Sequence, residues 1–64
     1  MRLKELRKAK GLSQQQLADE FETNRQNISL YEKGDREPNI ATLIKLANYF
    51  DVSVDYLIGH EKNV

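Results

Sequence analysis

The chain has 64 residues, of which 39% are hydrophobic and 31% are charged, and it contains no cysteine. A chain of this size forms one small domain, residues 1–64, that is stabilised by packing, because neither disulfides nor thiolate metal sites can crosslink it. The composition excludes collagen-like and low-complexity classes, and no apolar run approaches the roughly 20 residues that a membrane span requires. No secretory signal is evident, so a cytoplasmic protein is expected.

Charge is distributed unevenly along the chain. Ten Lys and Arg residues balance ten Asp and Glu residues, whereas a nucleic-acid-binding domain is typically basic overall. Residues 1–10, however, hold five basic side chains against one acidic, and residues 37–64 hold two basic against four acidic. This asymmetry can orient the N-terminal end toward a polyanion. The alternative is that the basic residues form an ordinary solvated helix face.

Two short amphipathic helices are predicted at the start of the chain. The first, over about residues 2–10, has leucines three positions apart and ends at Gly11. The second, over about residues 14–21, begins after Ser13, which can form a capping box with the glutamine three residues later. Small Ala18 on its apolar face permits a neighbouring helix to approach closely.

A third helix is predicted to begin after Thr23 or Asn24, either of which can cap it, and to end near Gly34. The connection between the second and third helices is therefore a tight turn. After a polar loop containing Pro38, a fourth helix is predicted over about residues 40–50. Its apolar residues recur at helical spacing and are Ile40, Leu43, Ile44, Ala47 and Phe50.

A fifth short helix is predicted between Ser53, its N-cap, and Gly59, which terminates it. No segment has the pattern of a strand, so the predicted fold class is all-α, with five short helices around one core. Residues 60–64 are expected to form a frayed tail.

The segment from Gln14 to Tyr31 resembles the helix-turn-helix of the phage repressor and Cro family of transcription regulators, of the xenobiotic-response-element type. The resemblance rests on small Ala18, a turn at Glu22-Thr23, and Ile28 ten residues after Ala18. The flanking segments that resemble the family in order are Gly11-Leu12-Ser13-Gln14, Tyr31-Glu32-Lys33-Gly34, Glu37-Pro38 and Val52-Ser53-Val54-Asp55-Tyr56-Leu57. The similarity covers about residues 3–59 and implies a compact five-helix DNA-binding domain.

One residue departs from the family pattern. The family usually has glycine at the ninth position of the motif, where the chain turns with positive φ, and this chain has Glu22. A non-glycine residue in the left-handed region costs on the order of 1 kcal/mol. We therefore expect Glu22→Gly to raise the melting temperature.

A recognition helix enters the major groove and presents its N-terminal residues to base edges, while the preceding helix lies across the DNA backbone. If Ile28 and Tyr31 face the core, four side chains lie on the opposite or flanking faces. These base-reading candidates are Arg25, Gln26, Ser29 and Leu30. Arginine can bond guanine, glutamine can bond adenine, serine can bond either type of base, and leucine can touch a thymine methyl. The alternatives are that the leucine packs on a neighbouring helix, that the serine is merely solvated, or that the arginine and glutamine form a polar surface without a role in base recognition.

Phosphate contacts would position the protein on DNA and supply most of the salt dependence of binding. Gln14 lies in the first turn of the second helix, where backbone N–H groups and the helix dipole favour an anion, and the resemblance implies the same role. By that resemblance the further phosphate contacts are Asn24, Asn27, Lys33, Arg36 and Asn39. For the lysine and the arginine the alternative is a plain solvated loop.

Arg7 and Glu32 occupy positions at which related repressors carry an arginine and a glutamate that pair. Such a pair would hold the first helix to the third and aim the Arg7 guanidinium at a phosphate, while Glu32 would limit the cost of burying the charge. The alternative is an exposed pair that contributes little.

A domain of this size contacts few base pairs, so control of a gene implies a symmetric homodimer on two half-sites about one helical turn apart. The last helix supplies more apolar surface than a capping helix needs, and related repressors pair through this end of the domain. The candidate dimer residues are Val54, Tyr56, Leu57 and Ile58. The alternatives are that all four cap the core of the monomer, and that the dimer forms only on DNA.

The sequence thus predicts a transcription regulator, a repressor in preference to an activator, with double-stranded operator DNA as its partner on the nucleoid. No cofactor, metal or catalytic residue is predicted, because the single histidine, His60, lies in the expected tail and no cysteine is present. The competing class is a protein-interaction module of the same fold that binds an antirepressor or toxin and contacts DNA weakly. Salt-sensitive binding to a short duplex would separate the two classes. The chain can also be either a whole protein or an excised domain.

Overall fold

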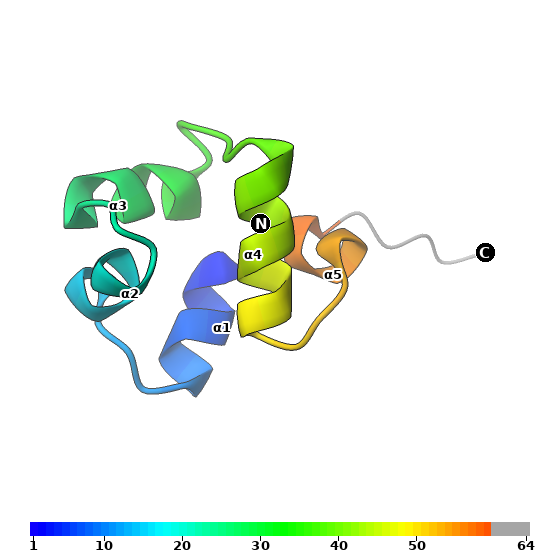
Figure 1. The fold of residues 1–64 in the computed structure, drawn as a ribbon, viewed down its shortest axis with the longest axis horizontal. Coiled ribbons are helices and arrows are strands. Elements are labelled where there is room, and N and C mark those ends of the chain that lie inside the picture. The colour runs from blue at the N-terminus through cyan, green and yellow to red at the C-terminus, as the bar shows by residue number, and fades with distance from the viewer. Residues whose placement is uncertain (60–64) are drawn as a thin grey trace.

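The computed structural model describes residues 1–59, which form five helices and no strand (Figure 1). The helices are α1 (Leu3–Ala9), α2 (Gln14–Glu20), α3 (Arg25–Lys33), α4 (Ile40–Tyr49) and α5 (Val54–Ile58). The predicted all-α fold is confirmed, and the predicted helix boundaries agree to within one residue. The tail expected over residues 60–64, with His60, lies outside the described residues. None of the helices within residues 1–59 is long and apolar enough to cross a bilayer.

Side-chain caps begin α2, α3, α4 and α5. The caps are Ser13, Asn24, Asn39 and Ser53, each of which accepts a hydrogen bond from a backbone N–H in the first turn of its helix. The Ser13 cap is the predicted capping box, because the side chain of Gln16 also accepts from the Ser13 backbone at 2.8 Å. A cap of this kind stabilises a helix by about 1 kcal/mol, which matters for helices this short.

The core draws buried side chains from every one of these helices. Its buried members are Leu3, Leu17, Ala18, Ile28, Leu46, Ala47, Phe50 and Leu57. Ala18 is completely buried, at a position where its small side chain leaves room for a neighbouring helix. Burial of one Leu or Ile side chain stabilises the fold by about 1.5–3 kcal/mol, so these few residues supply most of the packing energy.

Two apolar residues of α4 lie outside this core. Ile40 is 75% exposed and Ile44 is 47% exposed, although both fit the helical spacing of the buried residues. Leu46, which that spacing omits, is 1% exposed. The reason is that apolar residues occupy more than one face of α4, and the buried face is centred between Leu46 and Phe50. The two isoleucines lie at the edge of that face.

The prediction that Leu57 belongs to a dimer surface is wrong. Its side chain is 0% exposed and forms part of the core, because α5 turns this residue inward to close the domain. Tyr56 and Ile58 are 37% and 38% exposed, and Val54 is half-buried against the core. The start of the chain is fixed at this end, since the backbone N–H of Arg2 donates to the carbonyl of Leu57 at 2.7 Å.

Within residues 1–59, two non-glycine residues have left-handed backbone conformations. Glu22, between α2 and α3, has φ 54°, which is the positive φ predicted for the ninth position of the motif. Asp51, between α4 and α5, has φ 57° and was not predicted. Each such residue costs on the order of 1 kcal/mol, although aspartate adopts this conformation more readily than glutamate.

Candidate nucleic-acid interface

α2 and α3 form a compact unit on one side of the molecule, and α5 lies at the opposite end (Figure 1). The connection between α2 and α3 spans Phe21 to Asn24. The backbone N–H of Thr23 in this connection donates to the carbonyl of Ala18 at 3.0 Å. The left-handed backbone at Glu22 makes this short connection sterically feasible. The unit therefore holds α3 at a defined angle against α2.

The exposed face of α3 carries the predicted base-reading residues. Arg25 and Gln26 are exposed and Ser29 is half-buried, and the three line one hollow together with Gln14 from the start of α2. On the opposite side of the helix, Ile28 is buried in the core. The fold thus brings three of the four base-reading candidates and one predicted phosphate contact onto one surface.

Leu30, the fourth candidate, is half-buried and lines an adjacent hollow. The other residues that line this hollow are Thr23, Asn24, Gln26, Asn27 and Arg36. Among residues 1–59, Leu30 is not one of the apolar side chains packed against the core. Leu30 thus lies outside the core, and its contact with a base stays a prediction.

Arg7 and Glu32 form the predicted pair, and the pair is buried. Nε of Arg7 lies 2.6 Å from one oxygen of the Glu32 carboxylate, and the exposed fractions of the two side chains are 9% and 4%. A second guanidinium nitrogen donates to the other carboxylate oxygen at 3.3 Å, and the third donates to the carbonyl of Leu12 at 2.7 Å. The alternative of an exposed pair is excluded. All three nitrogens of Arg7 have protein partners, so its contact to a phosphate remains a prediction.

Gln14 is joined to the same carboxylate. Its Nε2 donates to Glu32 Oε1 at 3.0 Å, so one glutamate holds α1 and the first turn of α2 to the end of α3. One N–H of the Gln14 amide is used in this bond, and the other remains for an anion. Sequence reasoning did not find this contact, because neither residue carries a local signal for it.

On the other side of α3, the predicted phosphate contacts have different surroundings. Lys33 is exposed at the end of α3, and Arg36 is exposed in the following loop. Asn24 and Asn39 use their side-chain oxygens as helix caps, which leaves their amide N–H groups for DNA. Asn27 is half-buried, and its side chain forms three hydrogen bonds within the protein.

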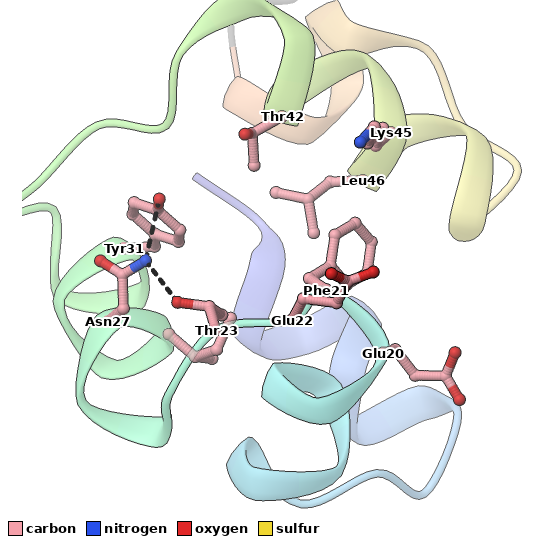
Figure 2. A pocket seen from close by; sticks show the side chains of 10 residues that line it. Glu20, Phe21, Glu22, Thr23, Asn27, Tyr31, Thr42, Lys45 and Leu46 are labelled. Atoms are coloured by element: carbon pink, nitrogen blue, oxygen red, sulfur yellow. Dashed lines mark hydrogen bonds between the residues drawn. The ribbon is translucent and has the colours of Figure 1, made fainter.

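A pocket opens between the α2–α3 connection and α4 (Figure 2). Asn27 and Tyr31 form one wall of this pocket, and Thr42 and Lys45 of α4 form another. It shares no residue with the hollow that contains Arg25. The Asn27 amide forms hydrogen bonds to Thr23 and Tyr31 in the wall of this pocket, on the inner side of α3.

Three of the five basic side chains in residues 1–10 contact other parts of the domain. Besides the buried Arg7, the guanidinium carbon of Arg2 lies 4.6 Å from the ring centroid of Tyr56, and Nζ of Lys10 lies 4.9 Å from that of Tyr49. Contacts of this kind contribute about 0.5–1 kcal/mol at exposed sites. Part of the local basic charge therefore serves the fold, which the charge count along the sequence could not show.

The comparison with known proteins agrees with this geometry. A family model described as Helix-turn-helix matches residues 3–57. The chain belongs to the helix-turn-helix family. The predicted resemblance is thereby confirmed, with α2 and α3 as the helix-turn-helix unit and α3 as its second helix.

Several curated relatives are named transcription regulators. The HTH-type transcriptional regulator YqaE of Bacillus subtilis (strain 168) is 48% identical over 95% of this chain and 53% of its own length. The regulator ImmR of the same organism is 41% identical over 95% of this chain and 48% of its own length. The transcriptional activator BcrR of Enterococcus faecalis is 36% identical over 95% of this chain and 30% of its own length. These helix-turn-helix relatives are regulators and not enzymes, in agreement with the prediction.

The chain spans about half the length of the first two of these helix-turn-helix relatives. No solved structure matches the chain with significance.

Proposed function

We propose that the chain binds DNA as the sequence-specific domain of a transcription regulator, with α3 in the major groove. The observation that carries the proposal is the hollow in which Arg25, Gln26 and Ser29 lie beside Gln14. Its residues include donors that match guanine and adenine edges and an amide suited to a backbone phosphate. The names of the relatives support the same function.

The predicted phosphate contacts lie at two places around α3. Gln14 lines the hollow itself, whereas Lys33 ends α3 and Asn39 caps α4 after the following loop. Contacts at both places would fix the register of α3 in the groove, because phosphate contacts position a protein and base contacts specify the sequence. DNA on the nucleoid would be the partner, in the cytoplasm of the cell.

We further propose a homodimer on a palindromic operator. Tyr56 and Ile58 of α5 expose apolar surface, and Ile58 lines a hollow with Met1 and Leu43, so apolar surface continues beyond α5. Val54 is half-buried against the core, so only the exposed part of its side chain could contribute to the dimer surface. Two copies related by a two-fold axis would present two α3 helices to half-sites about one turn apart.

Repression is the proposed outcome, because a protein bound over a promoter blocks transcription without further contacts. The name of BcrR, an activator, makes the opposite outcome a real competitor within the family. A reporter gene downstream of the operator would decide: repression predicts lower expression in the presence of the protein, and activation predicts higher expression.

DNA binding itself is tested by titrating a short fluorescent duplex with the chain at several salt concentrations. The proposal predicts that the affinity falls steeply as the salt concentration rises. The salt slope, which is the slope of log affinity against log salt concentration, should be about −0.9 for each phosphate contact. The control is Lys45→Ala, which removes an exposed cation from α4 outside the proposed interface. Absence of salt-dependent binding by a folded sample would favour the protein-interaction module, with an antirepressor or toxin as partner.

A further inference from the structure

The amide of Asn27 joins three segments around α3. Its Nδ2 donates to Oγ1 of Thr23 at 3.0 Å and to Oη of Tyr31 at 3.1 Å (Figure 2). Its Oδ1 accepts from Nη1 of Arg36 at 3.0 Å. The orientation of the amide follows from chemistry, because a guanidinium can only donate and must face the oxygen. The two hydroxyl oxygens then accept the two N–H groups.

This arrangement leaves the Asn27 side chain without a free hydrogen-bond donor for a phosphate. Both N–H groups of the amide are engaged, and its one remaining capacity is a lone pair on the oxygen. The oxygens of a phosphodiester also only accept hydrogen bonds. Asn27 could therefore bind a phosphate only by breaking a bond to Thr23 or Tyr31, which would leave a half-buried hydroxyl without its partner.

Arg36, in contrast, is held on α3 with most of its donors free. The left-handed Gly34, with φ 81°, turns the chain back at the end of the helix. The backbone N–H of Arg36 then donates to the carbonyl of Leu30 at 3.3 Å, and the side chain donates to Asn27. Within residues 1–59, no other side-chain bond of Arg36 is found, so four of the five guanidinium N–H groups remain available.

The position of Arg36 suits a contact with the DNA backbone. It is exposed and lines the hollow that also contains Gln26 and Leu30, two of the predicted base-reading residues. A guanidinium at the edge of that face would meet the strand that borders the groove. Because its backbone N–H and one guanidinium nitrogen are both bonded to residues of α3, Arg36 loses less conformational entropy on binding than a free loop arginine does.

We propose that Asn27 is a positioning residue: it holds the Arg36 guanidinium on the flank of α3, where Arg36 binds a backbone phosphate, and Asn27 does not contact DNA itself. This inference rests on the proposed DNA-binding function. It changes the role expected for Asn27 from the family resemblance, and it makes Arg36 part of the recognition helix surface rather than a mobile loop cation.

The test is a double-mutant cycle on binding to a short mixed-sequence duplex. Arg36→Ala should weaken binding and lower the salt slope by about one. Asn27→Ala should weaken binding about two- to tenfold, the cost of ordering one long side chain. The double variant should bind no more weakly than Arg36→Ala. An Asn27→Ala effect that persists undiminished in the Arg36→Ala background would overturn the proposal, and so would an Asn27→Ala variant that binds like the wild type.

Two controls separate positioning from folding. Tyr31→Phe removes one acceptor of the Asn27 amide and leaves the bond to Arg36 intact. It should retain most of the affinity, and a loss as large as that of Asn27→Ala would show that the effect comes from the fold of α3. Lys45→Ala removes an exposed cation elsewhere and should leave the salt slope unchanged.

A second measurement needs no DNA. In the free protein, ¹⁵N relaxation of the Arg36 side-chain Nε–H should show an ordered guanidinium in the wild type and a mobile one in Asn27→Ala. A wild-type Arg36 as mobile as that of the variant would overturn this inference while leaving the proposed function intact. An ordered Arg36 in a wild-type chain that binds no duplex would defeat the proposed function, and the phosphate contact with it.

Discussion

The carboxylate of Glu32 at the end of α3 lies 2.6 Å from Nε of Arg7 in α1, and both side chains are almost inaccessible to solvent. The same carboxylate accepts from Gln14 at 3.0 Å, so one acidic residue joins α1, α2 and α3. The contact fixes the side of the α2–α3 unit that carries the predicted phosphate contact of Gln14. It links the stability of the domain to the geometry of its proposed DNA surface.

Glu32→Ala should strongly destabilise the domain. The substitution leaves the buried Arg7 guanidinium without its counter-charge, and breaking a buried pair in this way costs about 3–5 kcal/mol. Urea denaturation followed by circular dichroism at 222 nm measures the change in the free energy of unfolding. The matched control is Glu37→Ala, since Glu37 is exposed. A loss below about 1 kcal/mol in Glu32→Ala would mean that the pair contributes no more than a surface ion pair.

Glu22→Gly should raise the melting temperature. Relief of the left-handed strain at φ 54° is worth up to about 1 kcal/mol, or about 4–8 °C for a domain of this size. Asp51→Gly is the matched control at φ 57°, and we expect a smaller gain there because aspartate tolerates this conformation better. Thermal unfolding measured by circular dichroism checks both values. An unchanged or lower melting temperature for Glu22→Gly would contradict the assignment of strain to this turn.

Gln26→Ala should relax the base preference at one position of each half-site, at a cost of about 1–3 kcal/mol in discrimination. The reason is that the glutamine amide can bond adenine at two points, and alanine cannot. Competition between operator variants that differ at single base pairs measures the effect.

Lys33→Ala is the matched comparison, because it removes an exposed cation from the same helix. It should weaken all duplexes alike and lower the salt slope by about one. If Gln26→Ala lowered the affinity for all duplexes equally, without a change of base preference, Gln26 would be a DNA-backbone contact instead.

Ile58→Glu should weaken binding to a two-half-site operator far more than binding to a single half-site. Ile58 is 38% exposed, so the charge would perturb the proposed dimer surface and leave the core intact. Leu57→Ala, in contrast, should destabilise the monomer by about 2–5 kcal/mol, because Leu57 is fully buried. Duplex titrations and sedimentation measure the effect of Ile58→Glu, and urea denaturation measures the free energy of unfolding of Leu57→Ala. If Ile58→Glu lowered the affinity for both duplexes equally, this result would argue against a dimer through α5.

The elements of this fold could be predicted because their signals are local. Ser13, Asn39 and Ser53 are caps beside apolar periodic segments, and Gly34 and Gly59 end helices in the left-handed conformation. Even the positive φ of Glu22 could be predicted, because the family pattern marks that position.

What could not be predicted depends on contacts between elements. Leu57 and Ile58 are adjacent and equally apolar, and only the packing of α5 decides that one is buried and the other exposed. The periodicity of α4 did not distinguish Ile44 from Leu46 for the same reason. The hydrogen bonds of Asn27 and Gln14 join residues on different segments, so no sequence pattern announces them.

Sequence-specific DNA binding by α3 is tested most sharply by selecting bound duplexes from a random library with the purified chain at near-physiological salt, followed by sequencing. If α3 reads DNA as part of a symmetric dimer, the selection should enrich an inverted repeat whose half-sites lie about one helical turn apart. Absence of any enriched sequence, from a sample shown to be folded and helical, would contradict the claim that α3 of this chain reads DNA.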